Sequence, residues 1–578
     1  MNTTSNGWQD FEPTDKNERG YGNAFVDQAY GICRWIEGDF EYIERLTYLP
    51  GSELCCRNWQ SYVSDEHDRT WPMQADREIT VAATVDPDKQ RWQADPGDNP
   101  PTWMLCSQPR TVSFEIRDGE WIGFSIPGPL PVGATRFIVD DERFSIVFDS
   151  VCGSTRGGSL PAVYFVTALT DAYAVLDAHL AISRDLGLVR EDKPYYAWWS
   201  RPMYDTWGQQ LLYGNPCSAA NTPLTQTNVS DWVRDLEDKS GINDFTVCID
   251  VGWFEHYGDF KAGARLGGTA GLRALIDDLH GGGHKVILWF CPYMVSSESE
   301  LAASIPECMV RDRDGNLVTT HLYQLVDDNC DKSLIGNQNG FLDYSLPAVR
   351  EHMKAVIRYC LSPEPGCLDA DGFKFDFNHQ TPHPGRHTLY DTSWAAGDQM
   401  WHAVARLTHE RVHEVKADAL ITCSVSDVYM QPYVDMVRLG DSFVDSPSHW
   451  FRRARLISKL FPGTLIDSDT WYMTRSKALQ YWPCSAVYGV PSFMQLVQFD
   501  DGGGRLTAAD HSRLRAIWHL VEANPIEPDM AFCVDPENGV FERKYTSGPL
   551  AGFYAALAVD NHCLVIYNID EALLAATR

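Results

Sequence analysis

Short runs in which hydrophobic and polar residues alternate dominate the first part of the chain. Clear examples cover residues 77–86, 110–126, 135–149 and 162–170, and Gly, Pro and Asp separate them. Alternation with a period of two is typical of a β-strand that has one buried face. The series predicts an N-terminal β-sandwich, and the pattern of residues 171–188 predicts a helix that leads out of it.

The pattern changes near residue 195, where short apolar runs begin to alternate with helical segments such as residues 269–284 and 398–418. Eight apolar runs are predicted to be strands, at residues 195–200, 245–250, 285–290, 372–377, 419–424, 433–439, 463–468 and 490–495. Eight strand–helix units predict a (β/α)8 TIM barrel of the α/β class.

Three regions are therefore expected along the chain. They are an N-terminal β-sandwich over residues 1–190, a (β/α)8 barrel over residues 191–525 and a short C-terminal β appendage over residues 526–578. A chain of 578 residues is long enough for two or three domains.

Carboxylates recur at the same end of several predicted strands. Asp250 ends the second strand, Asp376 the fourth, and Asp441 follows the sixth, while Asp467 and Asp469 follow the seventh. The C-terminal ends of barrel strands meet at one face, where TIM-barrel enzymes carry their chemistry. These acids are distant in sequence, but we expect them to converge in space.

The stretch DADGFKFDFNH, residues 369–379, places a lysine and an aspartate in a phenylalanine-rich strand. Alternate strand residues face opposite sides, so Lys374 and Asp376 share one face and the phenylalanines take the other. Buried charges are costly unless they are paired or used. One interpretation is a purely structural ion pair between these two residues. The convergence of acids at one face of the barrel instead favours a role for them in a functional site.

The same alternation along the strands predicts that other polar and aromatic side chains point into the barrel interior. Arg438 points inward, where it can pair with Asp441 or hold a substrate hydroxyl, and Trp289 points into the barrel near its mouth. Trp253 fits either the core or the site, because tryptophan is usually largely buried.

Composition excludes some classes of binding partner. The net charge of −31 argues against nucleic acid and against an anionic membrane surface, both of which need a basic face. No apolar run approaches the length of a membrane-spanning helix, and the N-terminus does not resemble a signal peptide. The 16 cysteines form no CxxC pair, so reduced thiols and a cytoplasmic location are expected. The many Trp and Tyr rings suit sugar faces as well as a large core.

One motif supports a different class of enzyme. Residues His409 to His413 read HERVH, which matches the zinc-peptidase pattern with His409 and His413 as ligands and Glu410 as general base. The motif lies on the helix before the fifth strand, at the wrong end of the barrel, and no third ligand is recognisable. A zinc metallopeptidase is kept as an alternative.

Four segments together resemble the retaining α-glycosidases of glycoside hydrolase families 31 and 36. GFKFDFN, from residue 372, resembles their nucleophile strand, and KVILWFCPYMVSSESEL, from residue 285, resembles the family 36 segment W-F-E-P-E-M-V. CIDVGWFEHYGDF, from residue 248, and MVRLGDS, from residue 436, resemble the second-strand motif and the acid/base strand. The segments occur in the family's order across residues 195–500.

The resemblance implies Asp376 as nucleophile and Asp441 as acid/base, in a double displacement through a covalent glycosyl-enzyme. Lys374 would keep Asp376 ionised and bind the sugar. The contacts implied for the sugar come from Asp250, Trp253, Trp289, Lys374, Arg438 and Trp207. The substrate would be an oligosaccharide or another glycoside, with no cofactor and no metal, and a homo-oligomer is left open.

Three departures from the family pattern concern the choice of sugar. Val251 stands where the relatives carry a second aspartate, and Cys291 and Tyr293 stand where the family 36 segment has glutamates. A galactosidase-like or glucosidase-like preference for a terminal α-linked hexose therefore stays open. A non-catalytic carbohydrate-binding relative and a transglycosylase are further alternatives.

Overall fold

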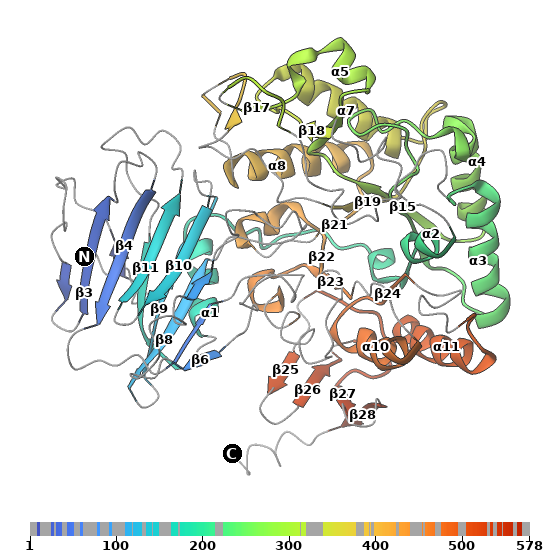
Figure 1. Ribbon diagram of the computed structural model, residues 1–578. Helices are drawn as coiled ribbons and strands as arrows, with labels where there is room; N and C mark the ends of the chain where they lie inside the picture. The colour runs from blue at the N-terminus through green and yellow to red at the C-terminus, as the bar shows by residue number, and fades with distance from the viewer. Residues whose placement is uncertain are drawn as a thin grey trace.

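The structure is a computed structural model (Figure 1). It describes residues 110–117, 120–129, 163–170, 174–213, 223–312, 314–318, 339–376, 387–391, 393–394, 398–423, 427–439, 454, 457–468, 475–494, 504–528, 532–535, 540–545, 547–558 and 563–568, and further strands between residues 9 and 149.

The centre of the fold is a sheet of eight strands in the order β23-β22-β21-β19-β15-β14-β13-β24, in which every neighbouring pair is parallel. A parallel bridge between Asp467 and Val490 joins the two ends and closes the barrel. The strands are β13 (Met203–Asp205), β14 (Thr246–Ile249), β15 (Lys285–Phe290), β19 (Gly372–Phe375), β21 (Leu420–Cys423), β22 (Met436–Arg438), β23 (Leu465–Asp467) and β24 (Ser492–Phe493). The predicted (β/α)8 TIM barrel is confirmed.

Strands buried on both faces read as continuous apolar runs, and this explains their sequences. All four residues of β14, and all but the first of β15, are buried. β19 and β21 approach so closely that a Cβ on Gly372 would lie 2.1 Å from the carbonyl oxygen of Leu420. The glycine at the start of β19 therefore permits the pairing that positions the end of this strand.

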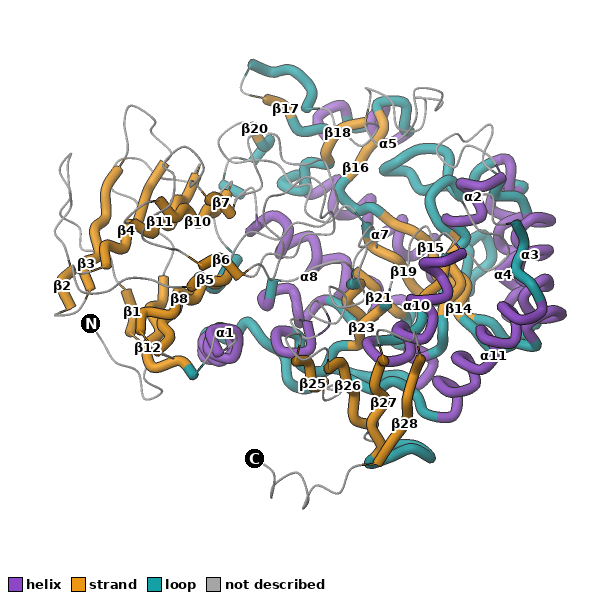
Figure 2. The backbone as a smooth tube through the Cα atoms, turned by 60° about the horizontal axis from the view of Figure 1, so that its bottom comes forward, coloured by secondary structure: helices purple, strands orange, loops and turns teal. Residues whose placement is uncertain are grey.

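Helices surround the barrel strands (Figures 1 and 2). They are α2 (Trp207–Tyr213), α3 (Gln226–Ser240), α4 (Gly268–Gly281), α5 (Glu300–Ser304), α7 (Pro347–Leu361), α8 (Asp398–Val415), α10 (Arg475–Tyr488) and α11 (Ala508–Ala523). The side chain of Thr225 caps α3, and Thr507 and Asp510 form a reciprocal capping box at the start of α11. Apolar faces of these helices bury against the strands and complete one hydrophobic core.

Shorter elements connect these units. They are the 3-10 helices η2 (Ala197–Ser200), η3 (Ala264–Leu266), η4 (Pro306–Cys308) and η6 (Val428–Tyr433), and the two-stranded sheets formed by β16 (Met294–Ser296) with β18 (Asn339–Phe341) and by β17 (Arg311–Asp312) with β20 (His387–Thr388).

The N-terminal part contains two antiparallel six-stranded sheets, as the alternating runs predict. One sheet runs β1 (Gln9–Phe11), β12 (Val163–Leu169), β9 (Glu120–Ser125), β8 (Thr111–Arg117), β5 (Asn58–Ser61), β6 (Glu78–Thr80). The other runs β2 (Phe25–Asp27), β3 (Tyr30–Ile36), β4 (Ile43–Pro50), β11 (Arg143–Asp149), β10 (Ala134–Asp140), β7 (Trp92–Ala94).

The predicted helix after the sandwich is α1 (Ala174–Asp185), which lies between the N-terminal sheets and the barrel in both views (Figures 1 and 2). Nε of Arg110 forms a buried ion pair of 2.7 Å with Asp427, beside η6. This contact ties the start of β8 to the barrel.

The C-terminal appendage is one antiparallel sheet of four strands, β25 (Phe532–Asp535), β26 (Val540–Lys544), β27 (Phe553–Ala558) and β28 (Cys563–Asn568). The fold class is thus confirmed in all three parts, while the boundaries at residues 190 and 525 stay a prediction. Among the described residues, no helix combines the length and apolarity that a membrane span requires. The six cysteines with described surroundings are free thiols.

One predicted strand is wrong. Residues 197–200 of the aromatic run at 195–200 form the 3-10 helix η2, and the first barrel strand is β13, which begins three residues after η2 ends. The β-propensity of the aromatic residues is overruled by tertiary contacts. Trp199 is buried and donates a hydrogen bond of 2.9 Å from Nε1 to the carbonyl oxygen of Asp418, which holds the turn in place.

Candidate active site

Charged and aromatic side chains meet at the C-terminal ends of five barrel strands. Asp205 ends β13, Asp250 follows β14, Trp289 lies near the end of β15, and Asp376 follows β19. Arg438 ends β22. This is the face where chemistry is expected in a TIM barrel.

The Lys374 ammonium lies between two carboxylates from other strands. Its Nζ donates hydrogen bonds of 2.7 Å to Oδ2 of Asp205 and 2.8 Å to Oδ2 of Asp250. The structural alternative that the sequence left open, an ion pair between Lys374 and Asp376, does not form, because the long side chain reaches across the barrel interior to β13 and the end of β14. The expectation that Lys374 itself holds Asp376 ionised loses its geometric basis.

Asp376 is held by two other groups. Nε1 of Trp289 donates a hydrogen bond of 2.9 Å to Oδ2, and Nη1 of Arg438 lies 3.3 Å from Oδ1. The side chain of Arg438 is 1% exposed and that of Asp376 is 10% exposed. The carboxylate is therefore oriented by a neutral and a charged donor, and it remains the more accessible member of the ion pair.

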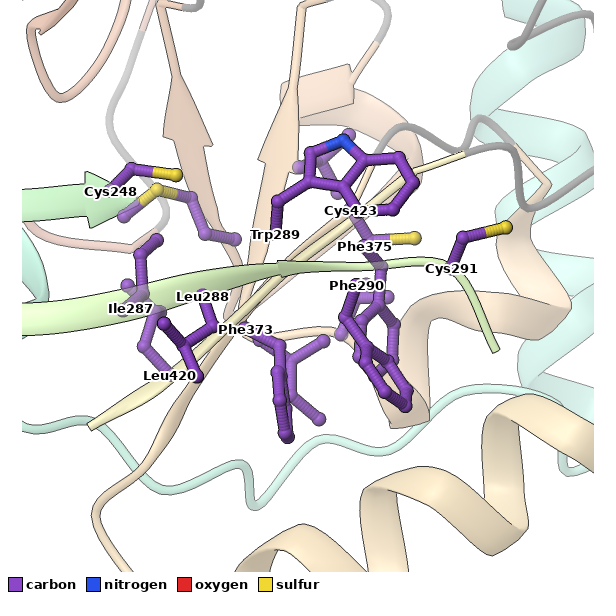
Figure 3. Packing of buried hydrophobic residues seen from close by; sticks show 14 of the residues in the cluster. Cys248, Ile287, Leu288, Trp289, Phe290, Cys291, Phe373, Phe375, Leu420 and Cys423 are labelled. Carbon is purple, nitrogen blue, oxygen red and sulfur yellow. The ribbon is translucent and has the colours of Figure 1, made fainter. Parts of the chain in front are cut away.

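The two faces of the strands separate polar from apolar residues, as the period-two pattern predicts. Trp289 pairs in register with Lys374, so their side chains share the interior face. Figure 3 shows Trp289 on one side of β15 and the rings of Phe290 and Phe373 on the other. The rings of Phe290 and Phe373 pack with centroids 4.6 Å apart.

Burial and mutual charge perturb the titration of this cluster. Burial and the neighbouring Asp205 carboxylate raise the pKa of Asp250 to about 7, although Lys374 opposes the shift. Burial lowers the pKa of Lys374, but the carboxylates of Asp205 and Asp250 outweigh this and raise it well above its ordinary value. The lysine is therefore a fixed positive charge, and Asp250 is the group that titrates near neutral pH.

Asp205, Cys248 and Asp250 offer three ligand atoms within 4.8 Å of one another, which raises the question of a metal. The ammonium of Lys374 already supplies the positive charge at 2.7 and 2.8 Å from the two carboxylates. Burial also raises the pKa of the Cys248 thiol well above its ordinary value, which disfavours the thiolate that a metal requires. These residues do not fit a metal centre.

The remaining predicted contacts lie around this cluster. Nε1 of Trp253 donates to the carbonyl oxygen of Trp289 at 2.9 Å, so its ring braces the end of β15 from a fully buried position. Trp207 is partly exposed at the start of α2, and its backbone N–H donates to Oδ1 of Asp205 at 2.9 Å. Asp441 and Asp469 lie outside the described residues, so their positions stay predictions. Oδ2 of Asp467 accepts a hydrogen bond of 3.1 Å from the hydroxyl of Thr422.

Sequence reasoning missed Asp205. The strand that carries it has only three residues, Met203–Asp205, and it follows an aromatic run that looks more like a strand. A usable signal was present, since MYD is an apolar pair closed by an acid, as the apolar run that ends at Asp250 is.

The peptidase motif lies elsewhere in the fold. His409 and His413 occupy the last turns of α8, which precede β21 and so lie toward the N-terminal ends of the strands. The side chain of Glu410 is 69% exposed and lies 4.0 Å from Arg406. The general base that the peptidase alternative requires thus faces solvent, away from the cluster at Asp376.

No known family model and no curated protein matches the sequence. Solved structures do resemble the fold. TtGalA, an α-galactosidase from Thermus thermophilus in complex with p-nitrophenyl α-D-galactopyranoside, is 15% identical with a TM-score of 0.53, over 93% of this chain and 97% of that chain. A variant of the GH36 α-galactosidase AgaA from Geobacillus stearothermophilus, in complex with 1-deoxygalactonojirimycin, is 14% identical with a TM-score of 0.53, over 96% and 79%.

A third structure with the same fold belongs to an enzyme with a different activity. The cycloalternan-degrading enzyme from Trueperella pyogenes is 14% identical with a TM-score of 0.53, over 87% of this chain and 70% of that chain. At these identities the similarity establishes a shared fold.

Proposed function

We propose that this chain is a glycosidase, a retaining α-glycoside hydrolase that removes a terminal α-linked hexose. The observation that carries the proposal is the carboxylate of Asp376, which Trp289 and Arg438 hold at 2.9 and 3.3 Å at the C-terminal end of β19. Acids in such positions of TIM-barrel enzymes are usually catalytic. The fold shared with two α-galactosidases supports the same assignment.

In the proposed first step, an oxygen of Asp376 attacks the anomeric carbon as the glycosidic carbon–oxygen bond breaks. Asp441, acting as an acid, gives its proton to the leaving oxygen. In the second step, Asp441 takes a proton from water, the water oxygen attacks the same carbon, and the ester bond to Asp376 breaks. The two acids return to their starting states, and the sugar keeps its configuration.

The donors around Asp376 serve both steps. Trp289 and Arg438 orient one oxygen each, which leaves the carboxylate in a fixed direction when the sugar arrives. They also stabilise the negative charge that returns to Asp376 when the ester is hydrolysed. This arrangement replaces the role that the sequence assigned to Lys374.

The cluster of Lys374, Asp205 and Asp250 would bind sugar hydroxyls. Carboxylates accept hydrogen bonds from hydroxyl groups, and the ammonium can donate to a hydroxyl oxygen. The three side chains are at most 5% exposed, so they are held in place before any sugar binds. Trp207, which is partly exposed, would supply an aromatic surface for the sugar, while the fully buried Trp253 supports the end of β15.

The identity of the hexose depends on positions where the chain differs from the galactosidase pattern. Val251, Cys291 and Tyr293 are all buried, and none of them offers a carboxylate to a sugar hydroxyl. Burial also raises the pKa of the Cys291 thiol, so this side chain is neutral at physiological pH. We infer an α-linked hexose and propose that the pocket around it differs from that of the galactosidases at these three positions.

A panel of aryl α-glycosides tests the proposal, with α-galactoside and α-glucoside as the first members. The expected result is cleavage of at least one, with the α-anomer seen first by NMR and with Asp376→Ala reducing turnover by many powers of ten. A 5-fluoro-α-glycosyl fluoride of the preferred sugar should leave a glycosyl adduct on the peptide that contains Asp376.

Asp371→Asn is the matched control, because Asp371 lies at the opposite end of the same strand and pairs with Lys285 at 2.9 Å. It should keep its turnover per folded molecule. Sugar binding without cleavage of any α-glycoside would instead support the carbohydrate-binding alternative, and release of the β-anomer first would exclude a retaining mechanism. Sugar products longer than the substrate would identify transglycosylation.

A further inference from the structure

A second cluster of ligating side chains lies away from the candidate active site. His409 and His413 stand one turn apart on α8, and Asp435 directly precedes β22. These positions are toward the N-terminal ends of β21 and β22, whereas Asp376 follows the C-terminal end of β19. The cluster therefore serves neither the sugar nor Asp376 directly.

The three side chains face one another at metal-ligand spacing. Nε2 of His413 lies 3.4 Å from Oδ2 of Asp435, and Nε2 of His409 lies 4.0 Å from Oδ1 of the same residue. One ligand atom from each residue falls within 4.8 Å of the others. Two ligands that bind one zinc ion tetrahedrally at about 2.1 Å lie about 3.4 Å apart, so modest adjustment closes this site.

Unpartnered atoms point to a missing ligand. Oδ1 of Asp435 and Nε2 of His413 are buried and have no hydrogen-bond partner among the described residues. The Asp435 side chain is 0% exposed, and only its Oδ2 is engaged, by the backbone N–H of Ile421 at 2.8 Å. A buried carboxylate oxygen left in this state is costly, and a bound cation would satisfy it.

The histidines are oriented as metal ligands are. Nδ1 of His413 donates a hydrogen bond of 3.1 Å to the carbonyl oxygen of Ala417, which leaves the lone pair on Nε2 directed at Asp435. Burial lowers the pKa of His409 to about 4, so that ring is neutral at pH 7 and able to ligate. The His413 side chain is 16% exposed, which gives an ion and a water molecule an approach.

The alternative is a plain ion pair between protonated His413 and Asp435. Burial lowers the pKa of His413, but Asp435 outweighs this effect and raises it, which favours the ion pair. The nearby cation Lys193 is engaged by the carbonyl oxygens of Gln431 and Val434 and by Thr464. The ion pair, however, leaves His409 without a function and Oδ1 of Asp435 without a donor.

We propose that His409, His413 and Asp435 form a structural site for a zinc-like divalent cation, with solvent as the fourth ligand. The ion would join the end of α8 to the start of β22 and stabilise the barrel. It is distinct from a peptidase centre, because Glu410 is 69% exposed and contacts Arg406.

The test uses the purified full-length chain, stripped with chelator and titrated with Zn²⁺ at pH 7. The expected result is one bound ion per chain that raises the melting temperature. His409→Gln and Asp435→Asn should each weaken zinc binding by at least about 100-fold, while Glu410→Gln should leave it unchanged. His402→Gln is the matched control, because His402 lies on the same helix, with its ring 5.2 Å from that of Tyr433.

A further measurement keeps the proposal falsifiable if a variant folds poorly. Bound Co²⁺ in the wild-type chain should show a spectrum without thiolate charge transfer, because the site has only nitrogen and oxygen ligands. No zinc binding by the wild type, a thiolate spectrum, or equal binding by the wild type and His409→Gln would each overturn the proposal.

Discussion

Lys374 and Asp376 stand on the same face of one strand, but they bind different partners. The lysine lies 2.7 Å from Asp205 and 2.8 Å from Asp250, whereas Asp376 accepts a hydrogen bond from Trp289 at 2.9 Å. The interior of the barrel is thus divided into two charge groups, one centred on an ammonium and the other on a carboxylate. Each of the two charge groups can therefore be tested by its own substitution.

Removing the ammonium should destabilise the fold. Lys374→Met leaves Asp205 and Asp250 buried without their shared cation, and the loss of one partner from a buried ion pair typically costs about 3–5 kcal/mol. The double variant with Asp205→Asn should lose less than the sum of the two single variants, because one of the stranded charges is gone. Urea unfolding of all four proteins measures this coupling, and strict additivity would contradict the assigned pairing.

Removing the indole donor should impair the reaction more than the fold. Trp289→Phe takes away the hydrogen bond to Oδ2 of Asp376 and preserves most of the ring volume. A hydrogen bond to a charged group contributes about 1.5–3 kcal/mol, so we expect kcat/KM to fall about 10- to 100-fold on the best substrate.

Trp518→Phe is the control for Trp289→Phe. Trp518 is fully buried in α11, and its Nε1 has no hydrogen-bond partner among the described residues. It should lower the melting temperature by a similar amount and leave kcat/KM near the wild-type value. Equal activity in the two variants would mean that the bond to Asp376 has no catalytic importance.

The parity argument explains why part of this site was predictable. A period of two assigns Lys374, Asp376 and Trp289 to the barrel interior before any fold is known. The partner of a long side chain depends on which strands come together and how far the chain reaches. For this reason the sequence assigned Lys374 to Asp376, two residues away, instead of to Asp205, 169 residues away.

Tertiary contacts also decide which secondary-structure elements form and which residues come together as metal ligands, and a local sequence pattern does not contain these contacts. Residues 245–250 end in an acid after a mostly apolar run, and β14 forms there. The aromatic run at 195–200 is shaped instead by the contact of Trp199 with the backbone of Asp418. The motif at His409 showed no third ligand in sequence, because Asp435 comes from a different element, directly before β22. Local pattern predicts the face of a residue, and tertiary packing selects its neighbour.

Titration of Asp250 should make stability depend on pH. Burial and the Asp205 carboxylate raise its pKa in the folded chain to about 7 from an ordinary value of 3.8, so between these values the folded chain holds a proton that the unfolded chain has lost. This contribution to stability is complete below the unfolded pKa and is lost as the pH rises through about 7.

Asp250→Asn is permanently neutral and should lack this dependence. The free energy of unfolding, measured in urea from about pH 4 to about pH 8, should fall more steeply for the wild type than for the variant. Asp192→Asn is the control, because the Asp192 side chain is 89% exposed and its loss should leave the slope unchanged. Parallel curves for wild type and Asp250→Asn would show that Asp250 does not carry the shift.

The predicted acid/base role of Asp441 rests on the motif MVRLGDS alone, because this residue lies outside the described part of the structure. An acid matters most when the leaving group is poor, so Asp441→Ala should lower turnover of unactivated α-glycosides by about 10²- to 10⁴-fold and of dinitrophenyl α-glycosides much less. Azide, which needs no base, should restore activity and give an α-glycosyl azide. A nucleophile variant at Asp376 should instead give the β-azide, so NMR of the two products separates the roles. An equal loss on all leaving groups, without azide rescue, would exclude Asp441 as the acid.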